Sequence, residues 1–470
     1  MYSLQLIVLS AIPLAMSASP QLLARQSTTS ITVNTEKTYQ TMDGFGFSEA
    51  FQRANLIVSL PADKQKSVID LLFNTTTGAG FTILRNGIGS SPDSSSDHMN
   101  TIEPKSPGSP SGTPNYVWDG KDSGQLWVSQ QAVKYGVKTF YANAWSAPGY
   151  MKTNNNENNG GYLCGVSGQT CSSGDWKQAF ANYLVQYIQY YQAAGVSITH
   201  LGFLNEPDYS ASYASMQSSG TQAADFIKVL SPTLKAANLT DVGITCCDAE
   251  GWSTQVSMTQ QIKSAGAESL LSAITSHSYT SGPSGPISTS RKVWQTEYGD
   301  LNGAWTTAWH GSGGAGEGLT WANNIYNAIV NANCSAYLYW VATQGGSTNE
   351  KLIQIDSSNN VAVSKRLWAF ANWSRFVRPG AVRVQTQGGS LKTSAFKNVD
   401  GTLAVQVINT GSSAASVSIA LQGFNGTAVA GWITDNTHDL SSTTAQISST
   451  GTVTGSVPGY AMVSFVVSGS

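Results

Sequence analysis

Two glutamates, Glu206 and Glu297, each follow a short apolar segment of the chain. The first segment belongs to Leu201–Tyr209, which reads Leu-Gly-Phe-Leu-Asn-Glu-Pro-Asp-Tyr, and the second to Lys292–Gly299, which reads Lys-Val-Trp-Gln-Thr-Glu-Tyr-Gly. Such runs predict buried strands, because a parallel strand covered on both faces need not alternate. Two carboxyl groups at the ends of two strands of one barrel are what glycoside hydrolysis requires.

The neighbours of the two glutamates suggest different roles for them. A retaining glycosidase needs one carboxyl as acid and then base, and a second, ionised one as nucleophile about 5–5.5 Å away. Glu206 is the predicted acid, because Asn205 beside it can bind a sugar 2-hydroxyl. Glu297 is the predicted nucleophile, because Arg85 and Tyr279 are placed to reach it, and a cation and a hydroxyl donor would keep its pKa low.

Other residues near the strand ends are candidates for substrate binding. Trp145 follows the third predicted strand and Trp340 ends the eighth. An aromatic face there can stack on a sugar, although core packing explains either residue equally well. His277 is predicted to be a packed, hydrogen-bonded ring rather than a proton carrier, because the glutamates already supply acid and base. Pro207 should end its strand and bias Glu206 towards extended backbone.

The elements that must position these residues alternate between strand and helix over residues 41–378. Helical periodicity occurs, for example, in Ala62–Phe73, Trp176–Ala194 and Ala223–Ala237. This order predicts an α/β fold, a (β/α)8 TIM barrel with its active site at the carboxyl ends of the strands. The long loops Ser90–Asn115 and Asn154–Gly174 should lie on that face. The predicted barrel strands are Gly44–Phe47, Thr82–Gly87, Thr139–Ala144, His200–Asn205, Val242–Asp248, Ala273–His277, Lys292–Thr296 and Ala336–Trp340.

From about Ala381 the pattern changes to short segments with a period of two. It predicts a side-joined C-terminal β-sandwich over residues 379–470. An isolated strand, Ser30–Val33, lies within residues 27–40 and is cut off from the barrel by Asn34–Gln40. We expect it to join the sandwich and tie the two domains together.

Composition and the N-terminus indicate a secreted protein that meets neutral ligands. Only 11% of residues are charged, 10% are aromatic and the formal net charge is −2, which argues against nucleic acid as a partner. Residues 1–18 resemble a signal peptide, and no later apolar run is long enough to span a membrane. Five sequons fit secretion, although the apolar context of the third suggests an unused site; they lie at Asn74, Asn238, Asn333, Asn372 and Asn425.

The five cysteines suit an oxidising compartment. Cys164 and Cys171 bracket a polar loop and are predicted to pair. For the other three, either Cys246 or Cys247 bridges to Cys334, or all three are buried thiols. No cysteine and histidine cluster has the spacing of a zinc site, so we predict no metal.

Taken together, these motifs resemble glycoside hydrolase family 30. The resemblance covers about the whole barrel and extends to the sandwich. It implies retention, catalysis by Glu206 and Glu297, and no cofactor. The matching segments are Asp43-Gly44-Phe45-Gly46, Arg85, Trp145-Ser146-Ala147-Pro148 with Met151-Lys152, Asn205-Glu206-Pro207, His277 with Tyr279, and Thr296-Glu297-Tyr298.

Within the family, the chain resembles fungal xylanases that act on glucuronoxylan. It departs from the bacterial glucuronoxylanases, which read the uronic acid with an arginine after strand eight, because Val341–Lys351 contains none. Arg53, after strand one, is the candidate for that carboxylate, with a surface arginine as the alternative.

The sequence therefore predicts a monomeric retaining xylanase acting on (glucurono)xylan, either within chains or releasing short products from an end. The alternatives are an endo-β-1,6-galactanase or β-1,6-glucanase of the same family and, in another class, a non-catalytic carbohydrate-binding protein.

Overall fold

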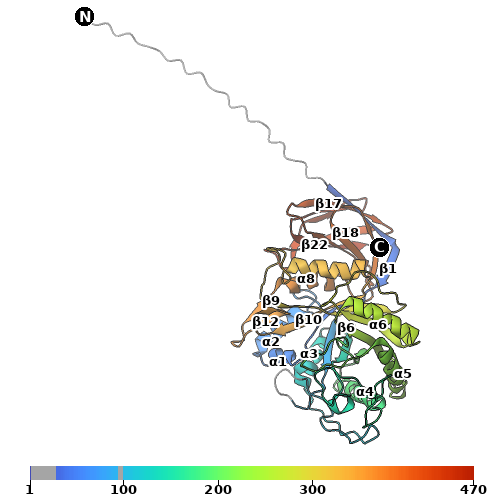
Figure 1. Cartoon of the computed structure of the whole chain (residues 1–470). Coiled ribbons are helices and arrows are strands. Elements are labelled where there is room, and N and C mark those ends of the chain that lie inside the picture. The colour runs from blue at the N-terminus through green and yellow to red at the C-terminus, as the bar shows by residue number, and fades with distance from the viewer. Residues whose placement is uncertain (2–27, 94–98, 470) are drawn as a thin grey trace.

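Eight parallel strands close into a barrel in the lower half of the molecule (Figure 1). The computed structural model describes Met1 and residues 28–93 and 99–469, so the predicted signal peptide lies outside the described residues apart from Met1. The last barrel strand pairs with both the first and the seventh, which closes the ring and confirms the predicted fold class. The strands are β2 (Gly44–Ser48), β3 (Ile83–Ile88), β4 (Thr139–Ala144), β5 (His200–Gly202), β6 (Gly243–Ala249), β7 (Leu271–His277), β8 (Lys292–Glu297) and β10 (Ala336–Gln344).

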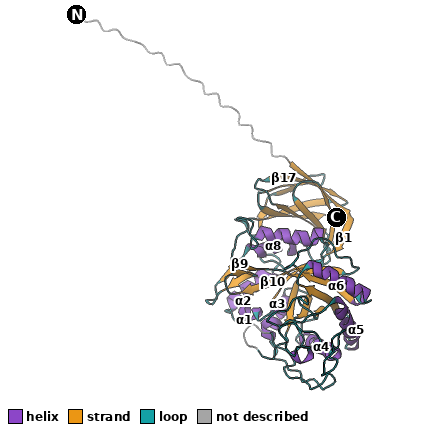
Figure 2. Ribbon diagram, in the orientation of Figure 1, coloured by secondary structure: helices purple, strands orange, loops and turns teal. Residues whose placement is uncertain are grey.

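Helices cover the outside of the barrel, and α8 lies between the barrel and the second domain (Figure 2). In α5 the apolar face buries Phe226, Ile227 and Leu230, and the Ser219 side chain caps the helix by accepting from the Gln222 backbone N–H. The helices are α1 (Arg53–Val58), α2 (Ala62–Phe73), α3 (Gln125–Lys134), α4 (Lys177–Ala193), α5 (Gly220–Ala236), α6 (Trp252–Ser264), α7 (Gly318–Tyr326) and α8 (Lys365–Ser374). Single turns lie at Asp122–Gly124, Gly149–Met151, Glu268–Leu270 and Asn327–Asn331.

Strands β2 and β3 approach closely because Gly46 has no side chain. A Cβ atom at Gly46 would lie 2.0 Å from the carbonyl oxygen of Ile83, so any larger residue would push the two strands apart. Since Arg85 lies on β3, this contact also fixes its position relative to β2, with which it pairs through Ser48.

The second domain is a β-sandwich whose ten strands form one continuous ladder. The predicted strand Ser30–Val33 is part of a longer strand, β1 (Thr28–Thr41). Asn34–Gln40, predicted to separate the strand from the barrel, belongs to β1 itself. It lies between β14, to which it is antiparallel, and β17, to which it is parallel. The other strands are β14 (Val382–Gln387), β15 (Lys392–Lys397), β16 (Leu403–Asn409), β17 (Ala415–Gln422), β18 (Gly426–Thr434), β19 (Ser441–Thr443), β20 (Ala445–Ile447), β21 (Val453–Val457) and β22 (Ala461–Gly469).

Buried contacts join the two domains and bear on one glycosylation prediction. The Asn372 side chain on α8 is fully buried and donates to the Trp368 carbonyl and the Thr434 hydroxyl, at 2.8 and 2.7 Å. Glycosylation at Asn372 is therefore incompatible with this fold, because the nitrogen that would carry the glycan is enclosed. The remaining sequon asparagines are partly or fully exposed: Asn74, Asn238, Asn333 and Asn425.

The structure contains two disulfides. Cys164 and Cys171 are paired, with their Cα atoms 5.6 Å apart, and close the loop after β4. Cys246 pairs with its neighbour Cys247 in β6. The predicted bridge from Cys246 or Cys247 to Cys334 is therefore wrong. The alternative of three buried thiols is right for Cys334, whose pKa is raised by burial, and wrong for Cys246 and Cys247, which are bonded to each other.

Four short strands, β9 (Asp300–Ala304), β11 (Thr348–Asn349), β12 (Lys351–Ile355) and β13 (Val361–Val363), extend the loops after β8 and β10. They place Asp300 and Glu350 on the same side of the barrel mouth. No helix of the described residues has both the length and the apolar composition of a membrane span.

Candidate active site

A cleft of about 580 Å³ opens at the carboxyl ends of the barrel strands. Among its lining residues are both predicted catalytic glutamates and four predicted substrate-binding residues, which are Arg53, Trp145, Tyr279 and Trp340. The remaining predicted residues, Arg85, Asn205 and His277, are buried beside these glutamates and contact them directly or through one another. The structure therefore brings the predicted set together at one mouth.

Glu297 is the last residue of β8 and is held from two sides. The register of β7 and β8 places it opposite His277. Its Oε2 forms an ion pair with Arg85 Nη1, and the Tyr279 hydroxyl donates to its Oε1 at 3.0 Å. These contacts point one carboxylate oxygen at a guanidinium and the other at a hydroxyl, which leaves the group little rotational freedom.

Glu206 lies beyond the end of β5, in a turn. The predicted extended backbone is wrong, because φ is +48°, in the left-handed region. Its N–H donates to the Asp248 carbonyl at 2.8 Å and its carbonyl accepts from the Tyr209 N–H at 2.9 Å, so hydrogen bonds on both sides hold the turn. A non-glycine residue in this region costs about 1–3 kcal/mol, and such strain occurs preferentially at functional sites.

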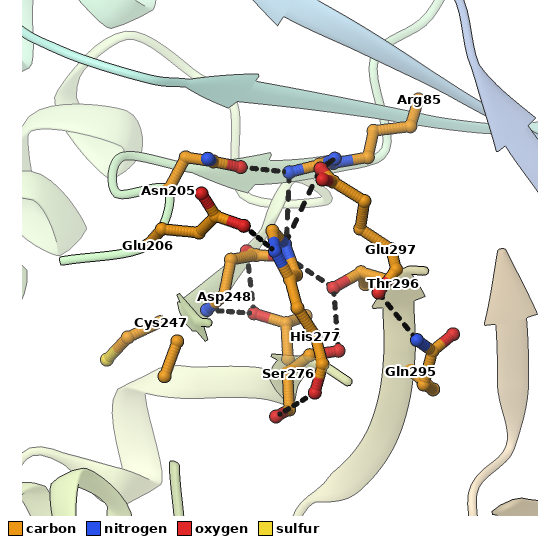
Figure 3. Close-up of polar contacts among 12 residues, drawn as sticks. Arg85, Asn205, Glu206, Cys247, Asp248, Ser276, His277, Gln295, Thr296 and Glu297 are labelled. Atoms are coloured by element: carbon orange, nitrogen blue, oxygen red, sulfur yellow. Dashed lines mark hydrogen bonds and ion pairs between the residues drawn. The ribbon is translucent and has the colours of Figure 1, made fainter. Parts of the chain in front are cut away.

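A buried aspartate, Asp248 at the end of β6, connects the glutamates to the barrel interior (Figure 3). It accepts hydrogen bonds from the hydroxyls of Tyr141, Thr275 and Thr296. It also lies 3.3 Å from His277 Nε2. Hydroxyl donors and a cationic neighbour make Asp248 a fixed anion.

His277 lies between three carboxylates. Its Nδ1 is 3.0 Å from Glu206 Oε1, and its Nε2 is 3.3 Å from Asp248 Oδ1 and 3.7 Å from Glu297 Oε2. Burial alone would lower the pKa of His277, but the charge of Glu297 and the hydrogen bonds to Asp248 and Glu206 raise it to about 10. The imidazole is therefore a cation at neutral pH, with both nitrogens donating.

Glu297 lies among two cations, Arg85 and His277, and one anion, Asp248. Burial favours neutral Asp248, but hydrogen bonding from His277 and the charge of Arg85 lower its pKa to about 2. With Arg85 and His277 cationic and Asp248 anionic, one positive charge remains, and Glu297 is the carboxylate paired with Arg85. Burial nevertheless raises the pKa of Glu297 above its ordinary value, and the two cations lower it only in part, so the prediction of a low pKa is wrong in sign.

The spacing of the two glutamates fits one glycosidic linkage. One carboxylate oxygen from each, together with one ring nitrogen of His277, lies within 4.8 Å of the others. Retaining glycosidases place their carboxyl groups about 5–5.5 Å apart, and inverting ones about 6.5–9.5 Å. The same three groups, two carboxylates and an imidazole, also have the composition of a metal site.

Arg85 links the two catalytic segments. Its Nη2 donates to Asn205 Oδ1 at 2.6 Å, while Nη1 pairs with Glu297. The ring of Trp145 lies 4.5 Å from the guanidinium carbon, and Trp145 and Trp340 pack together with ring centroids 6.2 Å apart. Both tryptophans are largely buried, so they form the packed floor of the cleft.

Sequence reasoning missed three residues of this site. Asp248 ends a predicted strand, so a third carboxylate at a strand end was the available signal for it. Tyr209 and Tyr213 line the cleft just after Glu206 and are 45% and 40% exposed, which makes them large apolar groups facing solvent at the mouth. No spacing rule distinguishes such tyrosines from ordinary loop residues.

Arg53 begins α1 and lines the cleft. Its Nη1 donates to the Phe51 carbonyl at 3.0 Å. It shares this lining with Phe51 and Trp340, and Glu250, Asp300 and Glu350 are acidic members of the same lining.

Comparison with known proteins places this architecture among glycoside hydrolases. Residues 28–282 match the family model "O-Glycosyl hydrolase family 30", and residues 380–465 match "Glycosyl hydrolase family 30 beta sandwich domain". The catalytic domain of a GH30 xylanase C from Talaromyces cellulolyticus superposes with a TM-score of 0.88 and 50% identity, covering 93% of this chain and 100% of that one.

Two more distant relatives are named for different activities. A family 30 subfamily 8 xylanase, Xyn30A from Clostridium acetobutylicum, shares the fold with a TM-score of 0.72 and 22% identity, covering 93% of this chain and 99% of that one. The endo-1,6-beta-D-glucanase neg1 of Aspergillus fumigatus is 28% identical over 405 residues, 79% of this chain and 79% of that protein.

Proposed function

Because the chain belongs to glycoside hydrolase family 30, we propose that it hydrolyses the β-1,4-xylosidic bonds of (glucurono)xylan with retention of configuration. Glu297 is the nucleophile and Glu206 the acid and base. The observation that carries this assignment is the position of Glu297 in an ion pair with Arg85, with one of its oxygens within 4.8 Å of one on Glu206.

The reaction proceeds in two displacements. Glu297 attacks the anomeric carbon, the bond to the leaving oxygen breaks, and Glu206 gives its proton to that oxygen. A water molecule then attacks the same carbon, Glu206 takes its proton, and the ester to Glu297 breaks. Each displacement inverts the carbon, so the product keeps the configuration of the substrate.

His277 balances charge in both halves of the reaction. In the first displacement the negative charge on Glu297 is lost to the ester, and a negative charge appears on Glu206. The His277 ring contacts both carboxyl groups, at 3.7 and 3.0 Å, so its positive charge faces the anion before and after transfer. No side chain has to move to follow the charge.

Asn205 and the aromatic lining bind the sugar. Arg85 accounts for the orientation of Asn205, because Nη2 donates to the amide oxygen and turns the amide nitrogen away from Arg85. That nitrogen is then available to donate to a sugar 2-hydroxyl, a bond that strengthens in the transition state. Tyr209 and Tyr213 offer neutral ring faces at the mouth, which suit an uncharged chain.

Xylan is favoured as the substrate by the 50% identity to the Talaromyces cellulolyticus xylanase over 93% of this chain. Arg53 is the candidate for the carboxylate of a glucuronic acid branch, because it is the arginine in the cleft lining. The relative from Aspergillus fumigatus supports β-1,6-glucan as the alternative substrate. The other predicted alternative, β-1,6-galactan, is included in the test below. A non-catalytic role predicts that Glu297→Gln leaves every measurable property unchanged.

We also propose that the enzyme is secreted and monomeric. Its catalytic barrel ends at about residue 378 and its sandwich domain begins at about residue 379, and the N-terminal segment, residues 27–40, belongs to the sandwich. The disulfides and exposed sequons support an extracellular site of action.

The test is product analysis on glucuronoxylan, unbranched β-1,4-xylan, β-1,6-glucan and β-1,6-galactan, each with the wild type and with Glu297→Gln as the inactive control. Xylo-oligosaccharides of β configuration at early times are expected from the first two. Products from either β-1,6-polymer with none from xylan would refute the assignment of substrate.

A further inference from the structure

Lys152 is a buried lysine below the rim of the cleft, and neither displacement step uses it. It is 3% exposed and belongs to the Met151-Lys152 segment that follows β4. Its Nζ donates to the carbonyl oxygens of Glu157 and Ser215, at 3.1 and 2.6 Å. Two segments far apart in the sequence therefore share one ammonium group.

These carbonyls belong to two loops, which we call rim loop A (residues 152–163, after β4) and rim loop B (residues 206–217, after β5). The loops lie side by side through a seam of backbone hydrogen bonds. The bonds run from Ser215 N to Glu157 O (3.0 Å), from Asn159 N to Ala211 O (2.8 Å) and from Gln217 N to Gly161 O (2.7 Å).

The Lys152 ammonium group adds two hydrogen bonds to those of the seam. Glu157 O accepts from both Ser215 N and Lys152, while Ser215 O points towards Lys152. Buried carbonyls require a partner, and an ammonium group has three donors and no acceptor. Burial lowers the pKa of Lys152 to about 7, against the charge of Glu157.

Rim loop B starts at Glu206 and carries part of the cleft wall. Tyr213, two residues before Ser215, lines the cleft and packs edge-on against Phe51 with ring centroids 5.5 Å apart. Rim loop B therefore joins the residue that protonates the leaving oxygen, Glu206, to a residue of the cleft wall, Tyr213. The position of this wall therefore depends on what holds rim loop B.

We propose that Lys152 is a positioning residue that fixes the leaving-group side of the cleft by tying rim loop A to rim loop B. The proposal rests on the function assigned above. It predicts that replacing Lys152 slows cleavage when the leaving group is a sugar held by this wall. Cleavage should be unchanged when the leaving group departs without contacts to the wall.

The test compares Lys152→Met with the wild type on two substrates, β-1,4-xylan and an aryl β-xylobioside with a nitrophenolate leaving group. We expect kcat/KM on xylan to fall about tenfold, equivalent to the loss of one hydrogen bond to a charged group. On the aryl substrate we expect kcat/KM to stay within about twofold of the wild type. Ser215→Ala, which removes the hydroxyl that accepts from Gly160 N at 2.8 Å, should give the same split if Lys152→Met does not fold.

The matched control is Lys365→Met. Its side chain is 14% exposed and pairs with Asp439 at 2.6 Å, where α8 meets the sandwich. It should match the wild type on both substrates. Equal loss on xylan and the aryl substrate for Lys152→Met, or no loss on either, would overturn the proposal, whereas a wild type inactive on both would instead overturn the proposed function.

Discussion

Replacing His277 with glutamine should remove a stabilisation of the folded protein that is present at low pH and lost as the pH rises. The imidazole has a pKa of about 10 in the folded chain, against 6.5 as its ordinary value. Below pH 6.5 both folded and unfolded chains bind this proton, so the stabilisation is complete there. Between pH 6.5 and 10 only the folded chain keeps it, and the stabilisation is lost as the pH rises.

The size of the effect follows from the same two values. A difference of about 3.5 pKa units at about 1.36 kcal/mol each corresponds to about 5 kcal/mol at pH 6. At pH 9 about 1 kcal/mol of this remains, because 1 unit separates that pH from the folded pKa. Wild type and His277→Gln should therefore differ by about 5 kcal/mol in free energy of unfolding at pH 6, and much less at pH 9.

Urea unfolding followed by tryptophan fluorescence at pH 6, 7.5 and 9 measures this difference. Nitrogen chemical shifts of labelled histidines report the imidazole directly, and His277 should remain protonated at pH 8.5. The matched control is His438→Gln, whose partly exposed ring pairs with Asp435 at 2.9 Å in the sandwich. A difference between wild type and His277→Gln that is the same at pH 6 and 9, or an imidazole that titrates near 6.5, would refute the reasoning.

Four other changes have distinct expected outcomes. Glu206→Ala should lower kcat on xylan by about 10²–10⁴, with azide restoring turnover of an aryl substrate as a β-linked azide; failure of this rescue would contradict its role as acid and base. Glu297→Gly should give an α-linked azide, and a β-linked product would exchange the two roles. Arg53→Met should lower kcat/KM on glucuronoxylan by about tenfold and leave unbranched xylan unchanged, and equal loss on both would exclude uronate recognition. Burial raises the pKa of Asp122 from 3.8 to about 6, against hydrogen bonds such as that from Tyr191, so this group loses stability for the fold as the pH rises from about 4 to 6. Asp122→Asn should therefore remove a fall of about 2 kcal/mol in unfolding free energy between pH 4 and 7, and the same fall in the variant would contradict this.

The sequence predicted the barrel strands well because each is an apolar run that needs no partner to be recognised. The strand ending at Glu206 was the exception: β5 stops at Gly202, and the next residues turn. Their turn depends on a hydrogen bond to Asp248 O, which comes from a distant segment. Pro207 alone indicated the opposite backbone at Glu206, since local preference does not include that partner.

The same limit explains what was missed around the two glutamates. Their position at strand ends identified them, but the role of Asp248 depends on the register between β6 and β7, which is irregular between Cys247 and Ala249. That register brings the Asp248 carboxylate to His277, and this contact helps to raise the pKa of the imidazole, which is therefore protonated at neutral pH. The sequence patterns also did not predict the short sandwich strands β19 and β21. These strands form because they pair with neighbouring strands rather than because of their own residues.

The sandwich cannot be completed by the C-terminal part of the chain. Its strand β1 precedes the barrel in the chain, yet it fills the gap between β14 and β17, which follow the barrel. A fragment beginning at residue 379 would leave both of those strands with open edges, which invite pairing with other molecules. Strand β1 can therefore meet its two neighbours only after most of the polypeptide has been synthesised, and deletion of β1 should cause aggregation of a domain encoded largely at the other end of the chain.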